Sequence, residues 1–317
     1  RPFGDALYAS DIFPWSYVLT GEEGNDPGYD PLAIMVQKAQ EHGLRIEAWI
    51  NPYRVRAKGS PKAICAENPV NAYLKSGSNA VIRYDGGTYY NPASQAARDL
   101  ITEGVIEIIK NYAVDGIHFD DYFYPTTDAA FDASDYRAYR SSGGSMALAD
   151  WRRENVNKLV RQVYAAVKQE KSSVLFGISP QARIDTNYNV QYADVGKWLS
   201  GSGYVDYICP QIYFGFEHDT APYSTLLDSW NQMAKGSGVD LYVGLAVYKC
   251  GVADGGAGSA KNEWINTDAM LEHQVEEARG KSAYAGFVLY RYDSIFRPAS
   301  AVQSCIARER ANLESIL

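Results

Sequence analysis

Short, nearly continuous apolar runs alternate along the sequence with longer segments whose apolar residues recur at helical spacing. The runs predict strands at 44–54, 114–125, 173–182, 205–214, 240–251 and 284–294. A strand that is apolar throughout is covered on both faces, which is typical of a parallel sheet with helices packed against it. This alternation restricts the possible folds more than any other feature, and it predicts an α/β fold.

The segments between the runs predict helices. In 31–43 the apolar residues follow helical spacing up to Gly43, and in 91–112 Asn91 is a suitable N-cap before Pro92. Further helices are expected at 147–170, 192–201, 223–238, 267–280 and 298–317. Residues 126–150 are predicted to be a long polar insertion on the side of the sheet where binding loops lie.

Polar and aromatic residues follow nearly every predicted strand. These strand ends read "WINPYR", "HFDDYFYP", "ISPQAR", "CPQIYF", "VYK" and "LYRYDS". A (β/α)8 barrel, or TIM barrel, carries functional residues at all of its strand ends, whereas a doubly wound sheet concentrates them where the strand order reverses. The sequence has no G-x-G-x-x-G motif and no Walker loop. We therefore predict a single TIM-barrel catalytic domain over residues 1–317.

A TIM barrel has eight strands, and the apolar runs account for six. The opening segment, residues 1–16, has the pattern of a strand end that continues into a loop. We therefore expect the first one to two strands of the barrel to be absent from this chain, which makes the predicted domain N-terminally incomplete. Neither an internal repeat nor a low-complexity linker indicates a second domain.

Two aspartates, Asp120 and Asp121, stand side by side at the end of an apolar run in "DGIHFDDYFYP". Adjacent ionised carboxylates repel each other, so a fold normally separates them or uses them. Strand alternation places His118 and Asp120 on one face and leaves Asp121 at the start of the loop. We predict that the pair acts in catalysis or substrate binding. The alternative is that one of the two only binds Arg54 or Arg291.

A second catalytic carboxylate is expected across the barrel mouth. Glu217, just past "CPQIYFGF", is the best placed and Asp185 the next, although a loop glutamate could equally be solvated. Residues at the strand ends are predicted to bind substrate: Asn51, Arg54, Tyr124, Gln181, Gln211, Tyr213, Tyr290 and Arg291. Candidate stacking aromatics are Trp15, Trp49, Tyr124, Phe214 and Tyr290. Packing at the barrel rim is the alternative role for each of them.

The composition argues against several other classes of protein. The net charge is −8 and the isoelectric point is about 5.1, without the clustered Lys and Arg that nucleic-acid binding requires. No apolar stretch of roughly 18 residues could span a membrane, and no signal peptide pattern opens the chain. The 25 tyrosines and six tryptophans suit contact with sugars, or equally a large β-rich core.

Metal and cofactor sites are not expected. The four cysteines, Cys65, Cys209, Cys250 and Cys305, are widely spaced and form no Cys/His cluster of the kind that holds zinc. No second histidine lies at ligand spacing from His118, which is expected to be a hydrogen-bonded core residue. We therefore predict no metal and no cofactor.

Several long motifs resemble one bacterial family. They are "RPFGDALYASDIFPWSYVLTG", "PGYDPLA", "EAWINPYRV", "YYNPASQAARDLI", "VDGIHFDDYFYP" and "ICPQIYFGF". Together they resemble the glycosyl-hydrolase-like family 10, also called domain of unknown function 187, over residues 1 to about 298. The resemblance implies a TIM barrel that hydrolyses glycosidic bonds, and one branch of the family acts on peptidoglycan glycan strands stripped of stem peptides. Family members usually begin with two further strands.

The "DGIHFDD" segment also resembles the fourth-strand motif of amylase-type hydrolases and, more loosely, the chitinase pattern D-G-x-D-x-D-x-E. Aligned on Asp115 and Gly116, Asp120 falls where these families keep a strand-end aspartate. The chitinase acid position falls on Tyr122. The resemblance therefore supports Asp120 but not a chitinase mechanism.

These features predict a bacterial glycoside hydrolase that is extracellular or in the cell envelope. The expected partner is a polysaccharide substrate, with peptidoglycan glycan strands as the leading candidate. The alternative is a non-catalytic glycan-binding protein on a truncated or degenerate barrel. The sequence predicts no oligomeric state.

Overall fold

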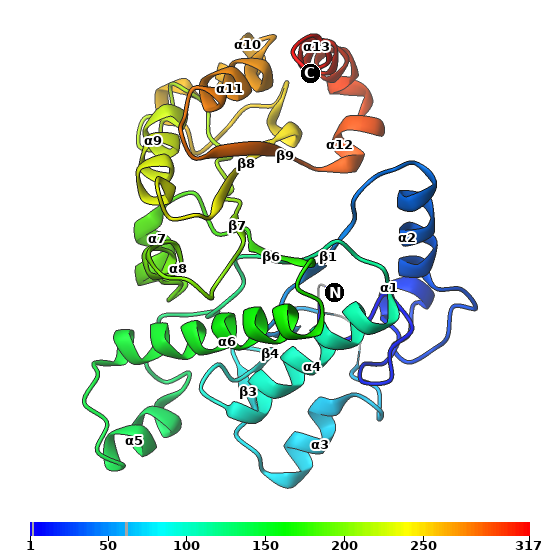
Figure 1. The fold of residues 1–317 in the computed structure, drawn as a ribbon, viewed down its shortest axis with the longest axis vertical. Coiled ribbons are helices and arrows are strands. Elements are labelled where there is room, and N and C mark those ends of the chain that lie inside the picture. Colours follow the sequence, from blue (N-terminus) through cyan, green and yellow to red (C-terminus); the bar gives the residue numbers. More distant parts are fainter. Residues whose placement is uncertain (2, 61–62) are drawn as a thin grey trace. The chain divides into compact units, whose positions relative to one another are not determined.

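Six strands form the main sheet of the protein. The computed structural model describes residues 1, 3–60 and 63–317, and within them the strand order is β1-β5-β6-β7-β8-β9 (Figure 1). The strands are β1 Glu47–Ile50, β5 Gly116–Phe119, β6 Leu175–Ile178, β7 Tyr207–Ile208, β8 Asp240–Ala246 and β9 Tyr284–Tyr290. The pairs β1–β5, β7–β8 and β8–β9 are parallel. Consecutive strands are neighbours and the order never reverses, which is the arrangement of a (β/α) barrel. The predicted fold class is confirmed.

The strands β5, β6 and β8 are largely buried. The expectation that the strands are covered on both faces is wrong for β1, whose residues alternate between exposed and buried, and for β9, where Val288 is 44% exposed. Ile117 and Phe119 of β5, and Leu241, Val243 and Leu245 of β8, have no exposed surface. The pairing of β7 is shorter than the predicted run 205–214, since Pro210 has no N–H to donate. Bridges resume beyond it, where Gln211 pairs with Gln181 and with Gly244. A Cβ on Gly244 would lie 2.9 Å from the Pro210 carbonyl oxygen, so this close approach requires glycine.

The chain divides into two compact units, each of which we describe on its own. The first comprises Arg1–Gly177, Asp185–Trp198 and Ser202–Val205, and the second Ile178–Ile184, Leu199–Gly201 and Asp206–Leu317. The single catalytic domain over 1–317 stays a prediction. No helix within the described residues has both the length and the apolar composition needed to cross a membrane.

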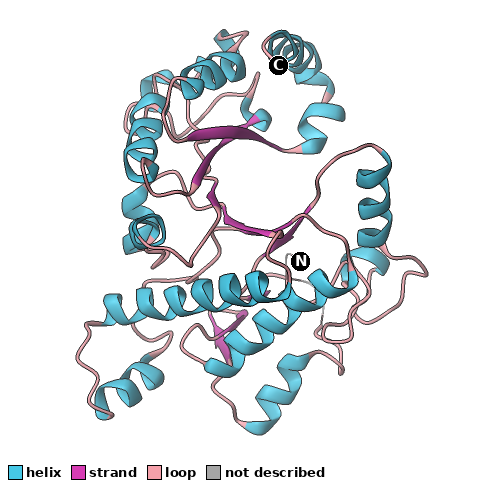
Figure 2. Cartoon of the chain, in the orientation of Figure 1, coloured by secondary structure: helices cyan, strands magenta, loops and turns pink. Residues whose placement is uncertain are grey.

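The two longest helices of the first unit, α4 and α6, lie side by side (Figures 1 and 2). Each buries an apolar stripe at helical spacing, which includes Ile101, Val105 and Ile108 of α4 and Val156 and Val163 of α6. The helices up to the end of this unit are α1 Tyr17–Thr20, α2 Pro31–Glu41, α3 Pro69–Ser76, α4 Gln95–Asn111, α5 Ala133–Ser141, α6 Leu148–Glu170, α7 Ile184–Asn189 and α8 Val195–Ser200.

A small antiparallel sheet in the first unit was not predicted. Its strands are β2 Arg54–Arg56, β3 Val81–Tyr84 and β4 Gly87–Tyr90, in the order β2-β4-β3 (Figure 2). Asp85 and Gly86 connect β3 to β4 with positive φ angles of 44° and 74°, as two-residue hairpins require. The predicted polar insertion 126–150 likewise contains a helix, α5.

The second unit adds helices around β7, β8 and β9. They are α9 Tyr223–Ala234, α10 Glu263–Asn266, α11 Met270–Arg279, α12 Tyr292–Phe296 and α13 Gln303–Ser315, with 3-10 turns η1 Val247–Lys249, η2 Gly258–Ala260 and η3 Ser300–Val302. The buried carboxylate of Glu309 in α13 accepts the N–H groups of Met270 and Leu271, both at 3.0 Å. It thereby satisfies donors that the start of α11 leaves without intrahelical partners.

A buried ion pair fixes the segment that follows β5. Arg152 of α6 and Asp132 have side chains with no exposed surface, and Arg152 Nε lies 3.0 Å from Asp132 Oδ2. The guanidinium also donates to the carbonyl oxygens of Thr127 and Asp128 and to the Tyr192 hydroxyl. Because these bonds satisfy its remaining donors, the buried charge is tolerated.

We predict that Asp132→Asn strongly destabilises the protein, because it leaves the Arg152 charge buried without a counter-charge. The free energy of unfolding should fall by about 3–5 kcal/mol, the usual cost of breaking a buried pair. Urea unfolding followed by circular dichroism measures this. The matched control is Lys58→Ala, which removes the exposed Lys58–Asp85 pair and should leave the midpoint unchanged. Equal midpoints for both variants would contradict the assigned role of Asp132.

Candidate active site

The carboxylates of Asp120 and Asp121 lie at the carboxyl end of β5 and are both nearly buried, at 7% and 8% exposure. The Asp121 N–H donates to Asp120 Oδ1 at 2.8 Å, and the Asp121 carbonyl accepts the N–H of Phe123 at 2.9 Å. The backbone therefore turns sharply after the strand. A hydrogen bond from a backbone N–H stabilises negative charge on Asp120. This is the location that the sequence predicted for the pair.

Asn51 occupies the neighbouring strand end. The parallel register pairs Ile50 of β1 with Phe119 of β5, so the next residues on each strand, Asn51 and Asp120, are adjacent positions at one edge of the sheet. Asn51 is 2% exposed, and its N–H donates to the Arg1 carbonyl at 2.9 Å. A buried amide beside a carboxylate suits a site that recognises hydroxyl or acetamido groups.

Arg54 begins β2, in the first unit. Its guanidinium carbon lies 4.0 Å from the centre of the Tyr122 ring and 5.0 Å from that of Phe3. Such contacts between a cation and an aromatic face hold both side chains in place. Tyr122 is 44% exposed and follows Asp121 directly, so Arg54 covers the loop that carries the carboxylates.

Aromatic packing anchors the rest of this loop. Phe123 lies 5.6 Å from Trp198 and 6.5 Å from Tyr53 between ring centres, and Tyr124 lies 5.1 Å from Tyr192. Tyr124 is only 2% exposed. Its role as a substrate contact stays a prediction, and its burial favours a packing role.

His118 of β5 is held in its neutral form. Burial lowers the pKa of His118 to about 4, from an ordinary value of 6.5. The described residues contain no group of three or more His, Cys, Asp or Glu side chains arranged to hold a metal ion. The His118 side chain is half-buried, and its role as a core residue stays a prediction. Two tryptophans are expected to stack against substrate. Trp49 of β1, which pairs with His118, is 47% exposed, and Trp15 is partly buried.

In the second unit, Gln181 and Gln211 are paired at the strand ends. They form a parallel bridge, and the Gln211 side-chain amide donates to the Ser179 carbonyl at 3.0 Å. The Gln211 N–H donates to the Pro180 carbonyl at 2.9 Å. The two glutamines therefore extend the sheet beyond the last regular residues of β6 and β7.

Three tyrosines cluster at the ends of β7, β8 and β9. The rings of Tyr213 and Tyr290 stack with centres 5.7 Å apart and planes 19° apart. Tyr248 stands edge-on to both, with its centre 6.0 Å from each. The sequence predicted Tyr213 and Tyr290 but not Tyr248, although "VYK" is among the strand ends it singles out. Phe214, another predicted stacking residue, packs with its ring centre 5.0 Å from that of His218, and its stacking role stays a prediction.

The remaining predicted residues lie on exposed loops and helix starts. Glu217 is exposed, and its N–H donates to Glu263 Oε1 at 3.1 Å. Arg291 is also exposed and forms an ion pair with Asp293, with Nε 2.7 Å from Oδ1. Asp185 is exposed in the first turn of α7. The catalytic role of Glu217 and the binding role of Arg291 stay predictions.

Glu263 is a buried carboxylate that sequence reasoning missed. Its Oε1 accepts the N–H groups of Phe216 and Glu217, at 2.7 and 3.1 Å, and burial raises its pKa. Its Oε2 fills the space beside Gly215 that a Cβ would need. Glu263 therefore pins the loop that carries Glu217. No periodic signal marks it, because it begins the short helix α10, 46 and 47 residues along the chain from the residues it binds.

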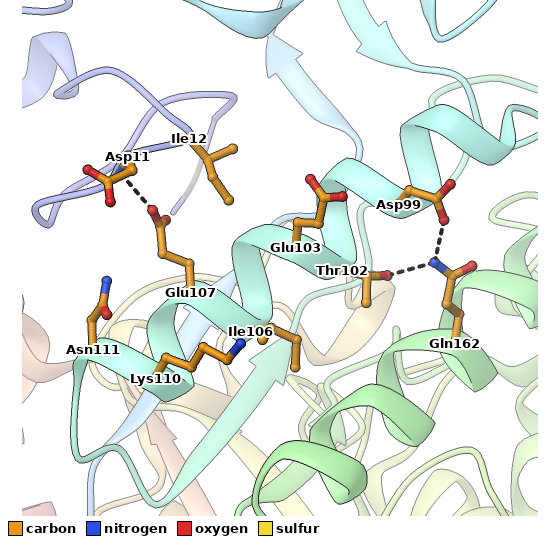
Figure 3. Close-up of a pocket in the computed structure, with 10 residues that line it drawn as sticks. All are labelled: Asp11, Ile12, Asp99, Thr102, Glu103, Ile106, Glu107, Lys110, Asn111 and Gln162. Atoms are coloured by element: carbon orange, nitrogen blue, oxygen red, sulfur yellow. Dashed lines mark hydrogen bonds between the residues drawn. The ribbon is translucent and has the colours of Figure 1, made fainter.

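A cavity of about 600 Å³ in the first unit lies away from these strand ends. Figure 3 shows it along one face of α4, between the loop at Asp11 and Gln162 of α6. Two of the carboxylates that line it have partners within the protein: Glu107 accepts the Asp11 N–H at 2.6 Å, and Asp99 accepts the Gln162 amide at 2.8 Å. The cavity contains none of the predicted site residues.

Comparison with known sequences decides the family. The sequence profile of Glycosyl hydrolase-like 10 matches residues 1–264. The chain belongs to this family. The glycosyl hydrolase YngK of Bacillus subtilis is 35% identical over 303 residues, which cover 90% of this chain and 58% of YngK. The glycosyl hydrolase DigH of Escherichia coli K12 is 34% identical over 322 residues, which cover 94% of this chain and 72% of DigH. The resemblance drawn from the motifs is confirmed.

Solved structures agree with a barrel fold. The PgaB (BpsB) glycoside hydrolase domain of Bordetella bronchiseptica matches with a TM-score of 0.60 and 13% identity, over 95% of this chain and 83% of that domain. A glycoside hydrolase family 18 N-acetylglucosaminidase of Paenibacillus barengoltzii matches with a TM-score of 0.51 and 9% identity, over 92% of this chain and 89% of that one. At such low identity the likeness shows the fold alone.

The neutral state of His118 predicts a pH-dependent component of stability. Between about pH 6.5 and 4 the unfolded chain binds a proton at His118 that the folded chain does not, so this contribution is complete above pH 6.5 and is lost as the pH falls. In His118→Gln the free energy of unfolding should therefore decline less on acidification than in the wild type. Denaturant unfolding of both proteins at several pH values in this window measures the difference. Parallel declines would contradict the lowered pKa.

Proposed function

We propose that the chain is a glycoside hydrolase of bacterial cell-wall polysaccharide, with peptidoglycan glycan strands as its substrate. The nearly buried Asp120–Asp121 pair at the carboxyl end of β5 is the observation that carries the proposal. The relatives support the proposal, because the family and the proteins YngK and DigH are named as glycosyl hydrolases. A polysaccharide substrate of this kind also favours an extracellular or envelope location.

Glycosidic cleavage divides the work between two carboxyl groups. One protonates the leaving oxygen, and the other acts as nucleophile or as the base that activates water. Asp120 suits the second role, because a backbone N–H stabilises its charge. Asp121 and Glu217 are the two candidates for the acid. Burial favours Asp121 as the acid. Glu217 is exposed, in a loop whose backbone N–H groups donate to Glu263.

Binding of the sugar would use the polar and aromatic strand ends. In the first unit these are Asn51 and Arg54, and in the second Gln181, Gln211, Tyr213, Tyr290 and Arg291. Amide groups donate to and accept from sugar hydroxyls, and tyrosine rings pack against the apolar faces of pyranoses. Such a mixture of a few polar groups with aromatic rings is typical of ligand sites.

Replacing Asp120 by Asn tests the catalytic assignment. The variant keeps the shape and removes the charge, so turnover should fall by about two or more orders of magnitude while the melting temperature stays near that of the wild type. Asp121→Asn and Glu217→Gln, assayed alongside, identify the acid as the variant with the larger loss. If Asp120 were only structural, Asp120→Asn would melt at a lower temperature and keep its turnover per folded molecule.

The substrate is tested by incubating the protein with denuded peptidoglycan, intact peptidoglycan, chitin and an α-glucan. We expect reducing ends to be released from denuded peptidoglycan, faster than from the other three. Release of reducing ends from chitin or α-glucan alone would support the proposed hydrolase activity but contradict peptidoglycan as the substrate. Affinity for these glycans without any release would favour the alternative, a glycan-binding protein.

A further inference from the structure

Tyr248 is more exposed than Tyr213 and Tyr290, the other two tyrosines of its cluster. It lies in the 3-10 turn η1, directly after β8, and 44% of it is exposed. Its ring stands nearly perpendicular to the stacked rings of Tyr213 and Tyr290, at interplanar angles of 89° and 87°. The three ring centres lie 5.7 to 6.0 Å apart. Tyr248 therefore adds an open aromatic surface to a cluster whose other two rings are partly buried.

The backbone beneath Tyr248 is held on both sides. The flanking residues Val247 and Cys250 are each 1% exposed, and the Cys250 N–H donates to the Val247 carbonyl at 3.1 Å. Lys249 Nζ lies 2.6 Å from Asp254 Oδ2 and 5.4 Å from the centre of the Phe214 ring. The turn is thus anchored by the residues next to Tyr248 in the chain.

An aromatic ring fixed on an anchored turn and left open to water costs the fold hydrophobic stabilisation that burial would supply. The same arrangement lowers the cost of binding, because little conformational freedom of the ring is lost when a ligand covers it. Tyrosine also combines an apolar face with a hydroxyl. Burial, with Asp254 and Tyr290 nearby, raises the pKa of that hydroxyl, so it stays a neutral hydrogen-bond donor. These properties match the apolar face and hydroxyl rim of a sugar ring.

We propose that Tyr248 forms, with Tyr213 and Tyr290, a subsite for one pyranose ring of the glycan, which stacks on the open face of Tyr248. The inference rests on the proposed function and adds a residue and a ligand class to it. Lys249 and Asp254 neutralise each other beside the subsite, so the bound ring is an uncharged pyranose, such as an N-acetylhexosamine.

The test compares Tyr248→Ala with Tyr248→Phe. Calorimetric titration with N-acetylglucosamine hexasaccharide, and with soluble denuded glycan strands, is carried out in the slow Asp120→Asn background. Tyr248→Ala should raise Kd about tenfold or more, because the stacking face is lost. Tyr248→Phe keeps that face and should stay within about threefold. In the otherwise wild-type protein, Tyr248→Ala should raise KM and leave kcat nearly unchanged, since the residue holds no reacting atom.

The matched control is Tyr29→Ala, which removes an equally exposed tyrosine, at 51%, before α2 in the first unit. It should leave Kd unchanged. The melting temperatures of all three tyrosine variants should equal that of the wild type. If Tyr248→Ala has a lower melting temperature, the Kd values of Tyr248→Phe and Tyr248→Leu test the stacking role in its place. Leucine keeps apolar bulk without a flat face, so Tyr248→Leu should weaken binding as Tyr248→Ala does.

The outcomes separate this inference from the proposed function. Hydrolysis or binding by the wild type together with an unchanged Kd and KM in Tyr248→Ala would overturn the subsite and leave the hydrolase standing. Equal weakening by Tyr248→Phe and Tyr248→Ala would also overturn it, because the ring would not be the group that binds. Failure of the wild type to cleave or to bind any of the glycans would overturn both.

Discussion

The buried guanidinium of Arg152 holds the part of the molecule on which the candidate chemistry depends. From one helix it binds the Asp132 carboxylate, two backbone carbonyls and a tyrosine hydroxyl, and its carbon lies 5.2 Å from the centre of the Tyr124 ring. The chain between Phe119 and Asp132 is thereby fixed at both ends, by β5 at one and by this ion pair at the other. A buried charge with all of its donors satisfied has few alternative positions.

Within that segment, polar residues come first after the strand and apolar residues follow them. The first positions after the strand are Asp120 and Asp121, whose polar groups a turning backbone can satisfy. The next apolar positions, Phe123 and Tyr124, return to the core and pack against aromatic rings. Aromatic packing therefore holds the loop directly after the two carboxylates. A barrel scaffold supplies rigidity, and residues at the strand ends supply the chemistry.

The strands and the carboxylate pair can be predicted from the sequence, because strand burial and strand ends leave local patterns. Asp120 follows a mostly apolar run at the end of a predicted strand, and that is sufficient to locate it. The small sheet β2-β4-β3 has strands of three or four residues and no apolar run, and only Asp85-Gly86 signals its hairpin. The pairing of Arg152 with Asp132 joins a helix to a loop residue 20 positions earlier, and nothing local specifies it.

Among the candidate binding residues, too, some can be predicted from a local sequence pattern and others cannot. Tyr213 and Tyr290 are recognisable because each lies near the end of a predicted apolar run. Tyr248 also follows a strand, but its exposure and its perpendicular packing on the other two rings emerge only when three strands are assembled. Glu263 has no sequence signal at all, since its role is to bind backbone N–H groups 46 and 47 residues away.

The most direct test of this account is a crystal structure of the Asp120→Asn variant with a glycan oligosaccharide that spans the cleavage point. The account predicts that the side chain at position 120 lies within hydrogen-bonding distance of the scissile glycosidic oxygen, the anomeric carbon or the attacking water, with a second carboxylate on the opposite side of the bond. Their separation would then give the stereochemical outcome, about 5 Å for retention and about 6.5–9.5 Å for inversion. An oligosaccharide bound elsewhere, with position 120 out of reach of the scissile bond, would contradict it.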